Sequence, residues 1–200
     1  RNEDNSYPDV KYVGQPVAAV AADTLDIARQ AARLILVDYL EKPFVIDVEK
    51  AMKPESPLVF DAPIARQADG GDVGVVHDGS MGEGNLRGPS TSSFFGGPRG
   101  DLDTGFSQAD VIVEQTYRTQ VQTHVPLETH GVVIDWKPEG MTVYASTQST
   151  KDVRDELADY FDLPKSRVRV ICEFMGGGFG AKHSTSPYGP IAAILSQKTS

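Results

Sequence analysis

The residues of this chain that could do chemistry gather around a glycine-rich segment near its carboxyl end. The segment 168–175, which is rich in residues that favour β-strands, leads into residues 176–182, Gly-Gly-Gly-Phe-Gly-Ala-Lys. Glycine has no Cβ and reaches positive φ angles, so a large or anionic group can approach the backbone N–H groups closely. The segment is therefore typical of a loop that binds phosphate or a large cofactor.

A Walker-type phosphate loop is excluded by the residues at the end of this segment. That loop needs Gly-Lys followed by Ser or Thr. Here Ala181 separates Gly180 from Lys182, and His183 follows.

A dinucleotide site is a second possibility, because Gly176, Gly178 and Ala181 fit the pattern G-x-G-x-x-A after a strand. Such a site needs an acidic residue about 20 positions later to hold a ribose hydroxyl. No Asp or Glu lies between Phe174 and Ser200. A nicotinamide-binding oxidoreductase is therefore kept only as an alternative.

Several ordered blocks of the sequence resemble the molybdenum-binding large subunit of the xanthine dehydrogenase and aldehyde oxidase family. One is Ser-Thr-Gln at 146–148, taken together with the glycine segment. The other blocks are residues 13–32, 100–110 and 126–131.

The resemblance implies an α+β chain in which the end of an α/β hammerhead domain precedes the first part of a mixed α/β molybdopterin-binding domain. We expect the hammerhead portion at residues 1–61 and the molybdopterin-binding portion at 101–200. Residues 62–100 are rich in Gly, Ser and Pro, with almost no periodicity, which indicates a linker. His77 and Asp78 in this linker are interpreted as solvated loop residues and not as metal ligands.

The family's cofactor contacts map onto the two motifs. By resemblance, Gln148 faces an oxo group of the molybdenum. A Gln side chain offers two N–H donors without a charge, which suits such a ligand. The backbone of the glycine loop is expected to contact the cofactor, and no residue is expected to coordinate the metal directly. The loop residues concerned are Gly177, Gly178, Phe179 and Gly180.

The resemblance also implies the reaction and the partners. The cofactor would be molybdopterin with molybdenum, with or without a cytosine dinucleotide, and the substrate an aldehyde or N-heterocycle. The base glutamate is expected beyond Ser200, so the chain alone is predicted to be inactive and to need the remainder of its large subunit. Electrons would pass to iron–sulfur clusters and FAD on other domains or subunits, since the single Cys172 cannot hold a cluster.

Lys182 and His183 are candidates for the substrate pocket, with ordinary polar loop residues as the alternative. Purine-oxidising members of the family carry a glutamate where this chain has His183, which favours an aldehyde or another heterocycle. Glu128 and His130 form either a functional pair or a hydrogen-bonded pair between loops or domains, and the sequence leaves this open.

The formal net charge of −9 argues against nucleic acid or an anionic membrane as a partner. No run reaches the 18 or so apolar residues of a membrane-spanning helix. The chain begins with Arg1 and not Met, and no signal peptide precedes the fold, so it is interpreted as a piece of a longer protein. The sequence does not give the compartment: a cytoplasmic location is favoured, and a periplasmic one would need a signal on the parent. The alternative to an enzyme is a non-catalytic α/β module that binds a partner protein.

Periodicity predicts the elements that position these residues. The loops that carry Gln148 and Phe179-Gly180 are expected at the carboxyl ends of two strands, where α/β sheets usually place ligands. In the first half we expect strands at 16–22 and 35–40, a helix at 24–34 capped by Asp23 or Thr24, and a short helix capped by Asp47. In the second half, apolar residues alternate at 111–117, which indicates a strand, and residues 132–136 and 141–145 should form a hairpin around a turn that contains Pro and Gly. A helix capped by Ser149 or Thr150, a strand at 168–174 and a helix from Pro190 should follow. The helix after Ser149 should bury Val153, Leu157, Tyr160 and Phe161.

Overall fold

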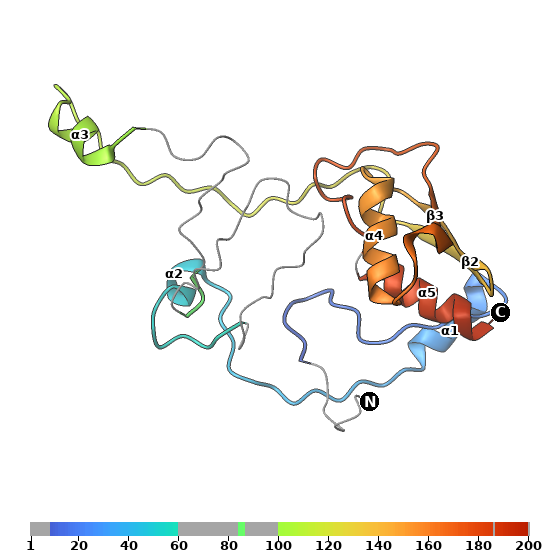
Figure 1. The fold of residues 1–200 in the computed structure, drawn as a ribbon. Coiled ribbons are helices and arrows are strands. Elements are labelled where there is room, and N and C mark those ends of the chain that lie inside the picture. Colours follow the sequence, from blue (N-terminus) through green and yellow to red (C-terminus); the bar gives the residue numbers. More distant parts are fainter. Residues whose placement is uncertain (1–8, 60–83, 87–99, 186, 200) are drawn as a thin grey trace.

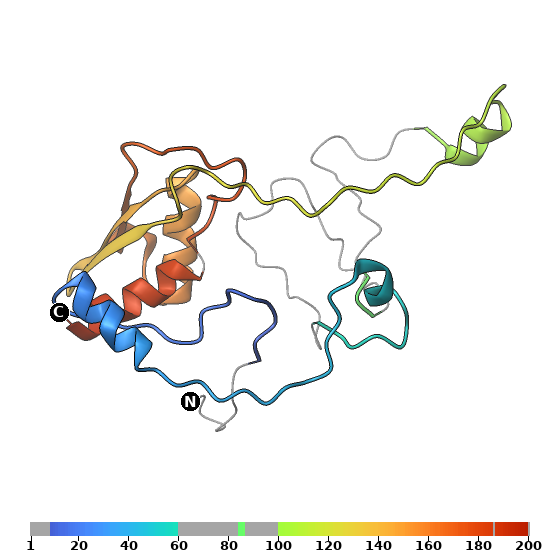
Figure 2. The same ribbon diagram turned by 180° about the vertical axis from the view of Figure 1, so that it is seen from behind.

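A computed structural model describes residues 9–59, 84–86, 100–185 and 187–199. Its helices are α1 (Leu25–Arg33), α2 (Val48–Ala51), α3 (Leu102–Ser107), α4 (Thr150–Tyr160), the 3₁₀ turn η1 (Lys165–Arg167) and α5 (Tyr188–Thr199). Its strands are β1 (Val132–Lys137), β2 (Gly140–Ala145) and β3 (Val168–Ile171). Figures 1 and 2 show the sheet with α4 and α5, well apart from the extended chain that carries α2 and α3.

The three strands form one sheet in the order β1-β2-β3. β1 and β2 are an antiparallel hairpin in which Lys137 faces Gly140, as predicted from the Pro and Gly of the connection. β2 and β3 are parallel, with Met141 beside Val168, and α4 makes the crossover between them. Parallel neighbours end at the same edge of a sheet, so the loops after Ala145 and Ile171 leave side by side.

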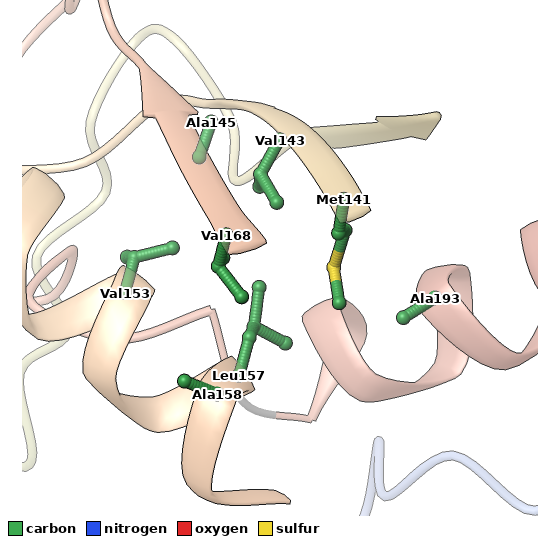
Figure 3. Packing of buried hydrophobic residues seen from close by; sticks show 8 residues of the cluster. All are labelled: Met141, Val143, Ala145, Val153, Leu157, Ala158, Val168 and Ala193. Atoms are coloured by element: carbon green, nitrogen blue, oxygen red, sulfur yellow. The ribbon is translucent and has the colours of Figure 1, made fainter. Parts of the chain in front are cut away.

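The core lies between one face of the sheet and the helices α4 and α5 (Figure 3). Alternate residues of β2, namely Met141, Val143 and Ala145, point into it, as the period of a strand requires. The remaining members are Val153, Leu157 and Ala158 of α4, Val168 of β3 and Ala193 of α5. The predicted helix stripe is correct for Val153 and Leu157, whereas Tyr160 is 61% exposed.

The helix caps also agree with the sequence. The Thr24, Asp47 and Ser149 side chains each accept a backbone N–H in the first turn of α1, α2 and α4. α5 begins at Tyr188, two residues before the predicted Pro190, and Pro190 still lies in its first turn, where its missing N–H costs nothing. Helix α3, capped by Asp101, was not predicted.

The strands expected at 16–22, 35–40 and 111–117 are wrong for this structure, and β3 stops at Ile171. A strand needs a neighbour to pair its backbone groups. These three segments have no such neighbour within the described residues, and many of their apolar side chains are exposed, including Leu36, Leu40 and Val113. The predicted linker, with His77 and Asp78, lies almost wholly outside the described residues. No described helix is long and apolar enough to cross a membrane.

An acidic side chain at the edge of the core gives a prediction about stability. Asp155 of α4 has a side chain only 7% exposed, and its carboxylate pairs with Arg154 at 2.7 Å, Lys165 at 3.1 Å and Lys151 at 3.3 Å. Burial alone would raise its pKa, but hydrogen bonds from Arg154, Lys165 and Lys151 outweigh burial and lower the pKa from 3.8 to about 2. The charged form is therefore favoured by folding.

Because this pKa is depressed in the folded state, the stabilisation is complete above pH 3.8 and is lost as the pH falls towards 2. We expect Asp155→Asn to lower the free energy of unfolding by about 1–2 kcal/mol at pH 7, since partly exposed lysines are screened by water. Urea unfolding at pH 7 and pH 2 measures this. A variant that differs from the wild type equally at both pH values would contradict the assignment.

Candidate functional site

The loops that follow β2 and β3 meet at the shared edge of the sheet, as predicted from the strand order. Residues 146–149 follow β2, and residues 172–185 follow β3, running above the sheet in Figure 1. The two loops are joined by Gln148, whose backbone N–H donates to Lys182 O at 2.8 Å. The carboxyl ends of parallel strands are where α/β proteins place their ligands.

The side chain of Gln148 is fixed by the glycine loop. Its Oε1 accepts the backbone N–H of Gly180 at 2.9 Å and that of Lys182 at 3.2 Å. Two donors on one atom assign that atom as the amide oxygen, so Nε2 must point the other way. Nε2 lies 3.4 Å from His183 Nε2, a long contact that uses at most one of its two N–H groups. Gln148 therefore presents an N–H donor in a defined direction.

The glycine loop has the backbone freedom that its sequence indicated. Gly177 and Gly180 have φ angles of 89° and 92°, and Phe179 has a φ of 53° although it is not glycine. A Cβ on Gly178 would lie 2.6 Å from Gln148 Cδ, so only glycine lets the amide lie against the loop. Within the described residues, the N–H groups of Gly177, Gly178 and Phe179 have no acceptor. The loop offers donors to a ligand.

Glu128 and Lys182 form an ion pair beside the loop. Lys182 is fully buried, and its Nζ donates to Glu128 Oε2 at 2.9 Å, to Glu128 O at 2.8 Å and to Ser146 Oγ at 2.9 Å. Glu128 Oε2 also accepts from Ser146 Oγ and from the Gly176 N–H, each at 2.6 Å. Hydrogen bonds from Ser146, Gly176 and Lys182, in that order, lower the pKa of Glu128 from 4.5 to about 2.

This arrangement places Ser146 beside a lysine, as in some hydrolases, but it does not make a nucleophile. A lysine that activates serine must be neutral to take the proton. Here the Lys182 ammonium is paired with the Glu128 carboxylate, and the Ser146 hydroxyl donates to that same carboxylate. The cluster therefore fixes the position of the glycine loop and does not supply a nucleophile.

The remaining predicted residues are placed as follows. His130 Nε2 lies 3.0 Å from Ala181 O, so His130 and Glu128 both reach the glycine loop and do not pair with each other. Lys182 was a candidate for the substrate pocket, and its buried, paired ammonium does not favour that role. His183 lies beside Gln148, and its Nδ1 is buried without a partner within the described residues.

The described residues contain no cluster of His, Cys, Asp or Glu that could hold a metal ion directly. The donors at this edge, the Gln148 amide and the open N–H groups of the loop, instead suit the oxygen atoms of a bound group. The pattern G-x-G-x-x-A is followed by residues 182–185, which form no helix, so it does not open the helix that a dinucleotide site requires.

Family comparison agrees with this donor-rich site. The model for the molybdopterin cofactor-binding domain matches residues 88–200. The chain belongs to the molybdopterin cofactor-binding domain family. Residues 6–43 match the a/b hammerhead domain of aldehyde oxidase and xanthine dehydrogenase, so the resemblance seen in the sequence and the predicted fold class are confirmed. The boundaries at residues 61 and 100 stay predictions.

Relatives of this molybdopterin-binding chain are named as oxidoreductases. A probable xanthine dehydrogenase subunit of Bacillus subtilis is 34% identical over 191 residues, covering 95% of this chain and 22% of the relative. The nicotinate dehydrogenase large molybdopterin subunit of Eubacterium barkeri is 32% identical over 174 residues, covering 86% and 35%. The chain thus spans about a fifth to a third of these relatives.

A solved structure shows the same fold. Quinoline 2-oxidoreductase from Pseudomonas putida 86 superposes with a TM-score of 0.66 at 24% identity, over 89% of this chain and 20% of that one. The donors of the molybdopterin-binding domain fit the cofactor by their chemistry, because a group rich in oxygen acceptors is matched by N–H groups. Beside them, Oε2 of Glu128 accepts from Ser146, Gly176 and Lys182.

The sequence singled out Gln148 and the glycine loop, which the structure brings together, but it did not indicate how they are held. Glu128 and His130 were noted only as a possible pair with each other, and Lys182 only as a pocket residue. The sequence showed Glu128, Lys182 and the three glycines 176–178 only as parts of separate motifs. Nothing in their spacing shows that they meet.

Proposed function

We propose that this chain forms one wall of the molybdenum cofactor site of an enzyme that hydroxylates an aldehyde or N-heterocycle. The observation that carries the proposal is the Gln148 amide, whose oxygen is held by two backbone N–H groups so that its NH₂ group lies on the side of His183 with at least one N–H unused. Beside it the loop offers N–H groups that have no acceptor within the described residues. These are the donors that a cofactor with oxygen ligands needs.

In this proposal the residues bind and orient the cofactor. Gln148 Nε2 donates to an oxygen ligand of the metal, and the backbone of Gly177–Gly180 contacts the cofactor. The cofactor itself supplies the two-electron oxidation of the substrate carbon. A neutral amide in a fixed direction stabilises an oxygen that gains negative charge, at no cost of reorganisation.

The substrate is proposed to be an N-heterocycle or aldehyde other than a purine. If Gln148 donates to His183 Nε2, the imidazole is neutral and carries its proton on Nδ1, the buried atom that has no partner in the described part of the chain. Such a ring presents no fixed anion to a substrate. The name of the 32% identical relative, nicotinate dehydrogenase, supports an N-heterocycle.

Electron carriers are proposed to lie outside these residues. Iron–sulfur clusters need several cysteines, and the chain has one, Cys172, whose Sγ lies near the Thr147 and Phe174 carbonyls. We therefore propose iron–sulfur and FAD domains or subunits as partners, together with a catalytic glutamate from further chain. A cytosine dinucleotide on the cofactor belongs to the same proposal.

The test is to purify the polypeptide that contains these residues and to measure molybdenum by elemental analysis. Oxidation of nicotinate-like heterocycles, aldehydes and xanthine is then followed with a dye as electron acceptor. We expect about one molybdenum per polypeptide, heterocycle or aldehyde oxidation, and loss of activity when cells grow on tungstate. Activity that persists without molybdenum would overturn the proposal.

A further inference from the structure

A chain of contacts links Glu128 to Gln148 through a single residue. The side chain of Lys182 donates to Glu128 Oε2, and the backbone N–H of Lys182 donates to Gln148 Oε1. The backbone carbonyl of Lys182 accepts from the Gln148 N–H at 2.8 Å and from Thr147 Oγ1 at 2.9 Å. Any shift of Lys182 therefore moves both the backbone and the amide of Gln148.

Glu128 also holds the other end of the loop. Its carboxylate accepts the Gly176 N–H at 2.6 Å, and a Cβ on Gly176 would lie 2.5 Å from Glu128 Cβ. Glycine at 176 is thus required by the close approach of Glu128, as glycine at 178 is required by Gln148. One carboxylate contacts both the first and the last residue of the segment 176–182.

We propose that Glu128 is a positioning residue that holds the glycine loop and Gln148 in the geometry that receives the cofactor. It acts through Lys182 and Gly176 and touches neither cofactor nor substrate. The role in cofactor binding rests on the proposed function, whereas the clamp itself, defined as Glu128, Ser146 and Lys182, is a property of the chain alone. The clamp removes the cost of ordering the loop at the moment of binding.

The experiment measures amide hydrogen exchange of residues 176–182 in the chain without cofactor, expressed as protection factors. Glu128→Gln leaves the buried Lys182 ammonium without its counter-ion, which is strongly unfavourable. We expect protection of the Gly180 and Lys182 amides to fall at least tenfold. Lys182→Met added to Glu128→Gln should restore part of the protection, because it removes the unpaired charge.

The matched control is Glu156→Gln. Glu156 Oε2 also accepts a hydroxyl, Ser184 Oγ at 2.9 Å, and a backbone N–H, Thr185 at 3.0 Å, but in the next stretch of chain. This variant should leave the amide protection factors of residues 176–182 unchanged. Equal loss of protection in both glutamate variants would mean general destabilisation and would overturn the clamp.

A pH series separates the clamp from plain packing. The series is run in an Asp155→Asn background, because the pKa of Asp155 is also lowered to about 2. In that background loop protection should persist well below pH 4.5 and fall as the pH approaches 2, while adding Glu128→Gln should remove this step. A loop that opens near pH 4.5 in that background, or the same step after Glu128→Gln is added, would overturn the assignment of Glu128.

Molybdenum content and turnover of the cofactor-loaded enzyme are measured in parallel. If exchange changes as expected but no molybdenum binds in the wild type, the proposed function fails and the clamp stands. If molybdenum binds and Glu128→Gln changes neither exchange nor content, the clamp fails and the proposed function stands.

Discussion

Replacing Gln148 with alanine should lower turnover of the molybdenum-loaded enzyme that contains this chain by about a hundredfold. The amide has a fixed direction, because Oε1 accepts from Gly180 and Lys182 while Nε2 lies 3.4 Å from His183 Nε2. Loss of one such preorganised donor costs about 2.7–4 kcal/mol in enzymes that stabilise an oxyanion. We expect the lower end of that range, since the backbone of the glycine loop also holds the cofactor.

Turnover is measured with saturating substrate and normalised to molybdenum content, so that a loss of cofactor is not counted as a loss of rate. Gln197→Ala, an exposed glutamine on α5, is the matched control and should be neutral. Gln148→Ala with an unchanged rate per molybdenum would show that the amide is only a residue at the end of a strand.

A second variant, Gly178→Ala, should displace the amide group of Gln148 without replacing Gln148 itself. Gly178→Ala places a Cβ against the Gln148 side chain, whose flexible end can move away without moving the backbone. The fold should survive while the amide is displaced, so turnover should fall as in Gln148→Ala. Gly131→Ala, where a Cβ meets nothing within 4 Å, is its control.

Replacing Leu157 with alanine should lower the free energy of unfolding by about 2–5 kcal/mol. Leu157 of α4 is completely buried and points towards β2 and β3 at the centre of the core (Figure 3). Truncation removes apolar contacts and leaves a cavity that its neighbours cannot fill completely. The core is small, so this is a large part of the stability of a domain.

Urea unfolding followed by circular dichroism measures the loss. Leu102→Ala removes the same atoms from a leucine that is 80% exposed in α3 and should change the stability by less than about 0.5 kcal/mol. Equal effects of the two substitutions would mean that the core is not where this structure places it.

The local parts of the fold were predictable because their signals are local. The turn at residues 137–140, the caps Thr24, Asp47 and Ser149 and the stripe of α4 each depend on residues a few positions apart. The placement of Gln148 and the glycine loop at one edge also followed, since both come directly after strands. These inferences need no knowledge of distant contacts.

The failures come from features that depend on distant partners. The segments 16–22, 35–40 and 111–117 have the composition of strands, but composition does not supply the neighbour that a strand must pair with. The Glu128–Lys182 pair joins residues 54 positions apart, and no periodicity relates them. Burial of Lys182 was likewise invisible, because lysine is usually an exposed residue.

The ion pair of the clamp also restricts how this sequence can change over evolution. A single substitution of Glu128 leaves the buried positive charge of Lys182 unpaired. A single substitution of Lys182 removes the side chain that connects Glu128 to the backbone bonded to Gln148. Neutral or reversed pairs are accessible only when both positions change together. We therefore expect positions 128 and 182 to vary jointly among descendants of this chain, at a pace set by the rarity of double changes.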